Sequence, residues 1–378
     1  MNYRLQRKDF LKKFSDQEVK DIKDYYKVMN LHKKRYTKNQ IKVKTNVSIH
    51  RIYRWRYTDS KPNSVKTFEK AKVRGYFKQF SNQNIQSLAY LIGYNLGDGH
   101  ISRNKCNTWF YGINSDLEDM KTLFRRFSVK PVVYTYKINN GKMAVHDCVF
   151  SRLLLCLGAV SGDKTKAETK IPNWILKTKK ASKIKKRFLQ GFFDSELSKI
   201  TLIKRKRLAY QSLKLYCSKH KNFINQGKFF FNQIRNVLTE FGIISSNIKF
   251  DRTYIRSRDG GNMQQIFFVI YSNYINLSNF IQRIGFLYNQ KRRLGSLMHI
   301  QKIKYHARKE IEKIKKYEKA LILRKKGFSA YKIAKELNIK VYHVKNWIYF
   351  KKRPKLYDFV KINNFVLHKQ RDEILFHR

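Results

Sequence analysis

The chain has 378 residues, enough for two or three domains, and its 42% hydrophobic and 15% aromatic content excludes a disordered basic tail. Lysine and arginine number 83 against 26 acidic residues, which gives a formal net charge of +57. A surface this basic repels itself and requires a polyanionic partner. Nucleic acid is the leading candidate, and an anionic membrane surface is the second.

Membrane-spanning and secreted proteins are excluded by the pattern of apolar residues. No run of about 18 uncharged apolar residues occurs, and the first residues lack the apolar core of a signal peptide. We therefore expect a protein of the cytoplasm or of an organellar matrix. The cysteines lack paired metal-ligand spacing, so we expect ordinary thiols in a reducing compartment. They are Cys106, Cys148, Cys156 and Cys217.

An internal repeat occurs near the two ends of the chain. Residues 1–35 are charged and helical in pattern, and residues 36–62 then align without a gap on residues 328–354. Each copy predicts a helix that begins after Thr37 or Ser329, a turn at an asparagine and a second helix. Asparagine tolerates the left-handed backbone of such a turn. The matched apolar positions, which we expect to point inward, include Ile49 with Val341, Ile52 with Val344 and Trp55 with Trp347.

This pattern favours a helix-turn-helix, whose second helix enters the major groove of DNA. The C-terminal copy resembles the small helix-turn-helix of resolvases and sigma factors, and we expect it to contact DNA. For the N-terminal copy, DNA contact and simple packing on the core remain open. The candidate contacts on the second helices are Arg51, Arg54, Tyr342, His343, Lys345 and Asn346.

Two further stretches share a plan, residues 87–102 and residues 187–201. Each predicts a helix of small and apolar residues that ends on an acid and leads into a strand. Gly93 and Gly97 share one helix face, which predicts close approach of another backbone. If the two helices pack in parallel, Asp98 and Glu196 meet at the end of the seam. Two adjacent carboxylates repel unless a cation bridges them, and oxygen ligands favour Mg²⁺ or Ca²⁺.

The segments that follow these stretches repeat the same order of elements. After the first come strands, a helix at 116–128, a hairpin at 131–150 turning at Asn139 to Gly141, and a closing helix. After the second come strands near 200–203 and 210–217 and a helix at about 222–241. A hairpin over 248–271 and a helix at 274–286 close that half. The pattern predicts two αββαββα halves in tandem, an α+β fold.

These residues resemble the LAGLIDADG homing endonucleases, in the single-chain form with two motifs. The motifs fall on LIGYNLGDG and LQGFFDSEL, and the family's metal-binding acids correspond to Asp98 and Glu196. Asn95 and Leu96 replace an apolar residue and an acid of the motif, and Leu197 replaces a glycine. The resemblance implies pseudo-twofold symmetry, a curved sheet in each half that sits astride DNA, and Mg²⁺ or another divalent cation.

A basic residue near each scissile phosphate would polarise the attacking water or stabilise the transition state. In the family, a lysine after the closing helix lies near the active site. Lys164 follows Gly158 at the same spacing at which Lys291 follows Gly285, so we expect these two lysines to serve, with Lys170 as the alternative.

Sequence readout is expected from strand residues that face the DNA groove, where polar and aromatic residues alternate. The candidates in the halves are His100, Ser102, Arg103, Tyr134, Tyr136, Lys137, Thr201, Lys204, Arg205, Lys214, Arg252, Tyr254 and Arg256.

The expected domains are 1–80, an N-terminal helical domain; 81–182 and 183–305, the two halves; and 306–378, a C-terminal helix-turn-helix domain with a tail. The leading hypothesis is a monomeric, metal-dependent endonuclease that cuts both strands of a long, asymmetric DNA site. One alternative is a DNA-binding regulator on a degenerate LAGLIDADG scaffold, and another is an intron maturase that binds RNA. No protein-splicing residues are evident at the ends, which favours a free-standing protein.

Overall fold

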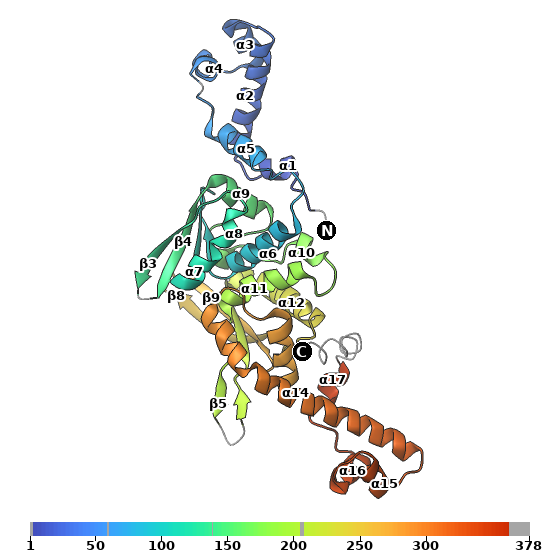
Figure 1. Ribbon diagram of the computed structural model, residues 1–378. Helices are drawn as coiled ribbons and strands as arrows, with labels where there is room; N and C mark the ends of the chain where they lie inside the picture. Colours follow the sequence, from blue (N-terminus) through green and yellow to red (C-terminus); the bar gives the residue numbers. More distant parts are fainter. Residues whose placement is uncertain (1–2, 59, 138, 205–207, 363–378) are drawn as a thin grey trace. The chain divides into compact units, whose positions relative to one another are not determined.

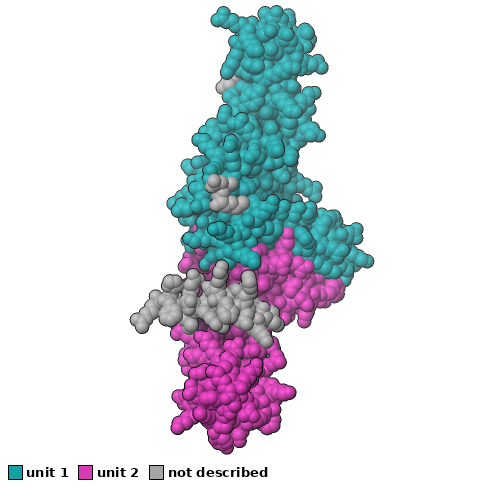
Figure 2. Space-filling view, turned by 90° about the vertical axis from the view of Figure 1, so that its right-hand side faces the viewer, with its two compact units in different colours: residues 1–196, 218–230, 253–264 teal, residues 197–217, 231–252, 265–378 magenta. Residues whose placement is uncertain are grey.

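The computed structural model describes residues 3–58, 60–137, 139–204 and 208–362. The chain divides into two compact units, coloured separately in Figure 2. Unit 1 comprises Met1–Glu196, Ser218–Phe230 and Thr253–Gln264, and unit 2 comprises Leu197–Cys217, Phe231–Arg252 and Gln265–Arg378.

Unit 1 begins with a helical region. Its helices are α1 (Arg7–Leu11), α2 (Asp16–Lys33), α3 (Lys38–Thr45), α4 (Ile49–Tyr57) and α5 (Asn63–Val73). Thr37 caps α3 in a capping box, and Asn46 ends it in the left-handed conformation with φ of 56°. Ile52 and Trp55 are buried, as predicted. Ile49 is 37% exposed, so its predicted inward position is wrong; it begins α4 directly after the turn.

An αββαββα half follows in unit 1 (Figure 1). It contains α6 (Asn82–Leu96), β1 (Gly99–Ile101), β2 (Asn107–Ile113), α7 (Asn114–Met120), α8 (Thr122–Arg125), β3 (Val132–Lys137), β4 (Asn140–His146) and α9 (Cys148–Cys156). The strands form an antiparallel sheet in the order β1-β2-β4-β3. Asn139 takes φ of 70° between β3 and β4, which confirms the predicted hairpin turn. The inward residues Phe110, Met143 and Val145 are fully buried.

Unit 1 continues with a short 3₁₀ turn η1 (Lys164–Lys166), α10 (Asn173–Leu176) and α11 (Lys183–Glu196). Trp174 Nε1 donates to the carbonyl oxygen of Leu157 at 2.8 Å. This bond ties the lead-in to α11 to the end of the first half.

The second half repeats the predicted order with one difference. Its elements are β5 (Leu202–Lys204), β6 (Leu208–Tyr210), β7 (Leu213–His220), the 3₁₀ turn η2 (Lys221–Phe223), α12 (Ile224–Glu240), β8 (Lys249–Arg256), β9 (Gly261–Ile270), α13 (Tyr274–Asn279) and the π turn η3 (Phe280–Ile284). The predicted strand at 210–217 is broken, because β6 pairs with β5 whereas β7 belongs to a sheet of order β7-β9-β8. The fold class is α+β, with small antiparallel sheets.

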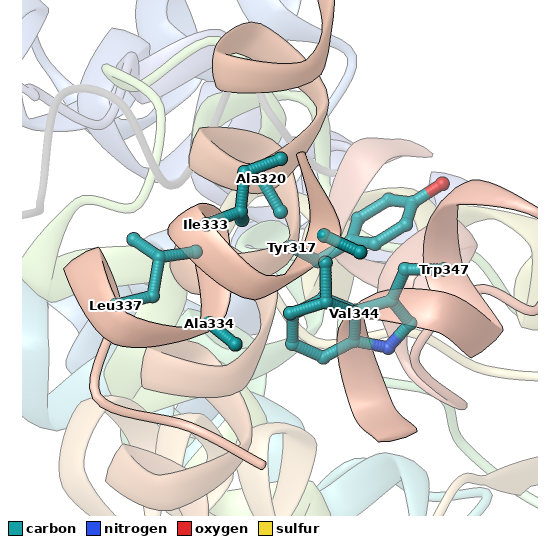
Figure 3. Packing of buried hydrophobic residues seen from close by; sticks show 8 residues of the cluster. Tyr317, Ala320, Ile333, Ala334, Leu337, Val344 and Trp347 are labelled. Carbon is teal, nitrogen blue, oxygen red and sulfur yellow. The ribbon is translucent and has the colours of Figure 1, made fainter. Parts of the chain in front are cut away.

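Unit 2 ends in helices around a compact apolar cluster (Figure 3). The helices are α14 (Gln290–Lys325), α15 (Ala330–Glu336), α16 (Val341–Ile348) and α17 (Tyr357–Ile362). The 36-residue α14 was not predicted. Trp347 packs edge-on against Tyr317 of α14, with ring centroids 5.6 Å apart. Ser329 caps α15, and Asn338 takes φ of 47°, as the repeat predicts.

The expectation of four thiols is wrong for one pair, because Cys106 and Cys148 form a disulfide. Asn107 pairs with His146 in the antiparallel ladder between β2 and β4, and this pairing brings the segments of the two cysteines together. Cys156 and Cys217 are thiols. Among the residues that the structure describes, no helix is long and apolar enough to cross a membrane.

Candidate active site

The seam between α6 and α11 is a contact of backbone on backbone. A Cβ added to Gly93 would collide with the carbonyl oxygen of Phe188 and lie 3.0 Å from Phe192 N. The reciprocal holds for Gly191, whose added Cβ would collide with the carbonyl oxygen of Tyr90. The prediction that glycine permits close approach is therefore confirmed, and the reciprocity gives the seam a local twofold character.

Both helices end at the same level of this seam. An added Cβ on Gly97 would collide with Ser195 Oγ and lie 3.0 Å from Glu196 Cγ. Asp98 directly follows Gly97, and Glu196 is the last residue of α11. The Asp98 side chain is exposed and that of Glu196 is half-buried. The fold thus brings the two predicted acids to one place, where two helix C-termini add negative potential.

A third acid near the seam, which belongs to the second motif, has a different environment. Asp194 is 4% exposed, and its Oδ2 accepts a hydrogen bond from Tyr90 Oη at 2.8 Å. Asn95, the departure in the first motif, is fully buried, and its Oδ1 accepts from Val160 N at 3.0 Å. The amide thus anchors the segment that follows α9, a bond that no local pattern in the sequence could reveal.

Lys164 lies at the C-terminus of α6. Its Nζ donates to the carbonyl oxygens of Asn95 at 3.1 Å, Leu96 at 3.5 Å and Gly97. The ammonium group therefore occupies the negative end of α6. Asp98 follows this end of the helix directly in the chain. The repeated spacing after a glycine was the signal that selected this lysine, and Gly158 does take a left-handed φ of 104°.

A second lysine near this point was missed. Lys219 is 2% exposed, and its Nζ donates to the carbonyl oxygens of Lys164 at 2.6 Å and Ala167 at 2.8 Å. Sequence reasoning had no signal for it among 83 basic residues.

The other proposed lysines are placed differently. Lys291 is exposed in the first turn of α14 in unit 2, and Lys170 forms an ion pair with Glu168 at 2.8 Å.

The outward face of the four-stranded sheet is aromatic. Tyr134 and Tyr136 are 44% and 56% exposed, as expected for a groove-facing strand. Lys142 on β4 lies 5.7 Å and 5.3 Å from the centroids of these two rings. Lys142, Trp109 and Tyr111 share the face but were not among the predicted contacts.

His100 stacks on Trp109, with ring centroids 5.2 Å apart. Burial, together with the positive charges of Lys164 and Arg258, lowers the pKa of His100 below its ordinary value. The imidazole is therefore neutral at pH 7. Ser102 is 9% exposed and its hydroxyl bonds to the turn residues Asn104 and Asn107, whereas Arg103 is exposed.

Predicted contacts in the second half have mixed environments. Lys214 and Arg252 are exposed, and Tyr254 and Thr201 are half-buried. The guanidinium of Arg256 is bound by Asp163 at 2.9 Å and Asp259 at 2.6 Å. Arg205 lies outside the described residues, and the side chains of Lys137 and Lys204 lie outside the described part as well.

On the repeated helices, Arg54 is exposed, whereas Arg51 pairs with Asp21 at 2.6 Å and covers the ring of Trp55. Tyr342 and His343 of α16 are exposed, and Lys345 and Asn346 are half-buried.

The described residues contain no group of three or more His, Cys, Asp or Glu side chains that could hold a metal.

The chain matches no protein-family model. It is 28% identical over 264 residues to the DNA-directed RNA polymerase subunit Rpo1N of Methanocaldococcus jannaschii, covering 62% of this chain and 18% of that protein. It is 27% identical over 287 residues to the tRNA-splicing ligase RtcB of Pyrococcus furiosus, covering 68% and 27%. It is 24% identical over 255 residues to the M. jannaschii replication factor C small subunit, covering 63% and 13%. The chain thus spans less than a third of each relative.

Solved structures to which this chain is similar include the homing endonuclease I-DmoI, at a TM-score of 0.34 and 13% identity over 54% of this chain and 91% of that one. The LAGLIDADG meganuclease I-CpaMI, bound to uncleaved DNA, matches at 0.35 and 10% identity over 58% and 92%. Full-length WhiA of Thermatoga maritima matches at 0.31 and 14% over 76% and 93%. These superpositions are loose, so the roles of individual residues rest on contacts within this chain.

Proposed function

We propose that this chain is a site-specific, metal-dependent DNA endonuclease of the LAGLIDADG homing type. The observation that carries the proposal is the end of the α6–α11 seam. There the segment of Asp98, the end of α11 at Glu196 and the ammonium group of Lys164 are brought together. The presence of two acids at one point of a chain with 83 basic and 26 acidic residues supports this proposal.

The donor set at the seam suits Mg²⁺. Asp98 and Glu196 offer carboxylate oxygens, and the carbonyl oxygens at the end of α6 already converge on a cation, the Lys164 ammonium group. Mg²⁺ binds through one or two carboxylates and keeps several waters, so a pair of acids is a sufficient ligand set for this ion. A bound divalent cation would lower the pKa of a water and neutralise charge on the phosphate.

The residues of the chain have separable tasks. Asp98 and Glu196 would hold the cation, and the Lys164 ammonium group would stabilise the extra negative charge on the phosphate in the transition state. Lys219 would keep the Lys164 backbone in place through its carbonyl oxygen, at 2.6 Å. Lys291 is proposed as the corresponding basic residue of the second half. Its support is the spacing after Gly285, which equals that of Lys164 after Gly158.

Double-stranded DNA is the proposed partner. The exposed aromatic and basic side chains on the outward face of the four-stranded sheet would contact bases and phosphates. The two repeated helical pairs would act as helix-turn-helix units that lengthen the footprint, and Arg54 and Tyr342 are exposed on their second helices. The net charge of +57 supports phosphate binding.

A mobile origin fits the curated relatives. A polymerase subunit, a ligase and a replication factor subunit share a segment with this chain, which covers only 18%, 27% and 13% of them. A segment common to such different hosts is expected of an inserted element, such as an intein with a homing endonuclease.

The test is cleavage of a plasmid library of random inserts in Mg²⁺ or in EDTA. The wild-type protein is expected to make specific double-strand breaks only in Mg²⁺. Asp98→Asn, which keeps the shape of the side chain and removes its charge, is expected to bind the same DNA without cutting it. Asp9→Asn, the same change at an exposed ion pair with Lys12, serves as the matched control.

Salt-sensitive DNA binding without cleavage by the wild-type protein would contradict the proposal and favour the regulator. RNA binding that exceeds DNA binding would favour the maturase.

A further inference from the structure

The segment after α9 that carries Lys164, residues 159–167, is called the lysine loop here. Its backbone is tied to the first half at two points. Gly162 N donates to the carbonyl oxygen of Ile101 at 3.0 Å, and Val160 N donates to Asn95 Oδ1 at 3.0 Å. Both ties precede Lys164, so they fix only the entry to the loop.

Arg256 of β8 holds the residues on either side of Lys164, and Arg258 adds a bond to Asp163 at 3.1 Å. Lys219 binds the loop from another side, at the backbone carbonyls of Lys164 and Ala167. Arg256 Nη2 donates to Asp163 Oδ2 at 2.9 Å, and Arg256 Nη1 donates to Thr165 Oγ1 at 3.0 Å. The rest of the guanidinium binds Asp259, with Nε to Oδ1 at 2.7 Å and Nη2 to Oδ2 at 2.6 Å. Arg256 is therefore fixed by its own hairpin and reaches across to the loop.

The contact with Arg256 strongly affects the ionisation of the Asp163 carboxyl group. Burial alone would raise the pKa of Asp163, but hydrogen bonds from Arg256 and Thr165 outweigh it and hold the pKa far below its ordinary range. Asp163 therefore stays ionised throughout the working pH range. Lys166 adds an ion pair with Asp259 at 3.3 Å, so the loop and the hairpin tip are joined by more than one bond.

We propose that Arg256 is a positioning residue for Lys164. By holding Asp163 and Thr165, it fixes the loop at the residues that flank Lys164, and so directs the ammonium group to the end of α6. This inference rests on the proposed function, in which Lys164 acts on one scissile phosphate. A displacement of about 1 Å at a reacting group costs on the order of a hundredfold in rate, so such a clamp has a measurable effect.

Lysine cannot replace arginine at this position, because it has no planar fork that serves three acceptor groups at once. Arg256→Lys keeps the positive charge and removes only this geometry. The experiment measures single-turnover cleavage of each strand separately, on the target found for the wild-type protein, for Arg256→Lys, Lys164→Met and the double variant. DNA affinity is measured in EDTA for each.

We expect Arg256→Lys to slow the same strand as Lys164→Met, by about 10- to 100-fold, with nicked product accumulating and DNA affinity unchanged. The double variant is expected to be no slower than Lys164→Met, because both changes remove the same contribution. Arg235→Lys is the matched control, since the bonds of the Arg235 guanidinium go to Ser245, Asn232 and Asn247.

Equal slowing of both strands, additive losses in the double variant, or wild-type rates in Arg256→Lys would each overturn the inference while leaving the proposed function in place. A wild-type protein that cuts neither strand would overturn both. If Arg256→Lys does not fold, Asp163→Asn tests the same contact from the loop, with the same strand-selective slowing expected and the same outcomes against it.

Discussion

Single side chains at the seam set the charge balance of the site. Asp98 is exposed and Glu196 half-buried, whereas Asp194 is buried and bonded to Tyr90. Asp194 is therefore held inside the seam, whereas the proposed cation ligands Asp98 and Glu196 lie nearer the surface. The nearby ring of His100 is neutral, because burial and the charge of Lys164 oppose its protonation.

His100 gives a prediction at this scale. Its NMR titration midpoint is expected below the ordinary 6.5 and is expected to rise in Lys164→Met, although not fully, because burial is the larger cause. Since the unfolded chain binds this proton more readily, His100 is expected to cost stability as the pH falls through 6.5. Lys166→Met, which removes a charge from the same loop, is the control. An unchanged midpoint in Lys164→Met would contradict the placement of Lys164.

Helices α6 and α11 form the element on which the site depends. Backbone contact at Gly93 and Gly191 brings their C-termini together, so in the proposed function the glycines would act through packing. Larger residues at these points would separate the helix ends and hence Asp98 and Glu196.

Gly93→Ala tests this contact. The added Cβ meets backbone atoms of Phe188 and Phe192, and these atoms can move only if helix α11 moves with them. We therefore expect a loss of about 1–3 kcal/mol in the free energy of unfolding. Gly295→Ala is the control, because nothing lies within 4 Å of its added Cβ in α14. It is expected to gain about 0.5–1 kcal/mol from helix propensity. Urea melts that rank the two variants the other way would contradict the seam.

Local signals explain which elements the sequence predicts well. The left-handed turns at Asn46 and Asn338, the hairpin at Asn139 and the glycine seam each depend on one residue type with a particular backbone or size. The glycine pattern and the motif resemblance selected Asp98 and Glu196, and a repeated spacing selected Lys164; their roles stay predictions. Lys219, the Asn95–Val160 bond and the Arg256–Asp163 contact join residues far apart in the chain, and no local pattern encodes them.

At the scale of the whole molecule, the charge distribution is the defining property. A chain with a net charge of +57 attracts phosphate along its length, and this attraction carries no chemistry by itself. Catalysis requires a place where cations are bound in spite of that charge. In the proposed function the seam end would supply it, because two helix C-termini and the carboxylates of Asp98 and Glu196 concentrate negative potential there.

The most direct test of this claim is to locate the metal. Fe²⁺ would replace Mg²⁺ in the full chain with duplex DNA present, and ascorbate with peroxide would generate radicals that cut the backbone near the ion. We predict cuts around Asp98 and around Glu196 that excess Mg²⁺ suppresses and that Asp98→Asn removes. Cuts elsewhere, or cuts that persist in Asp98→Asn, would contradict a metal site at the seam.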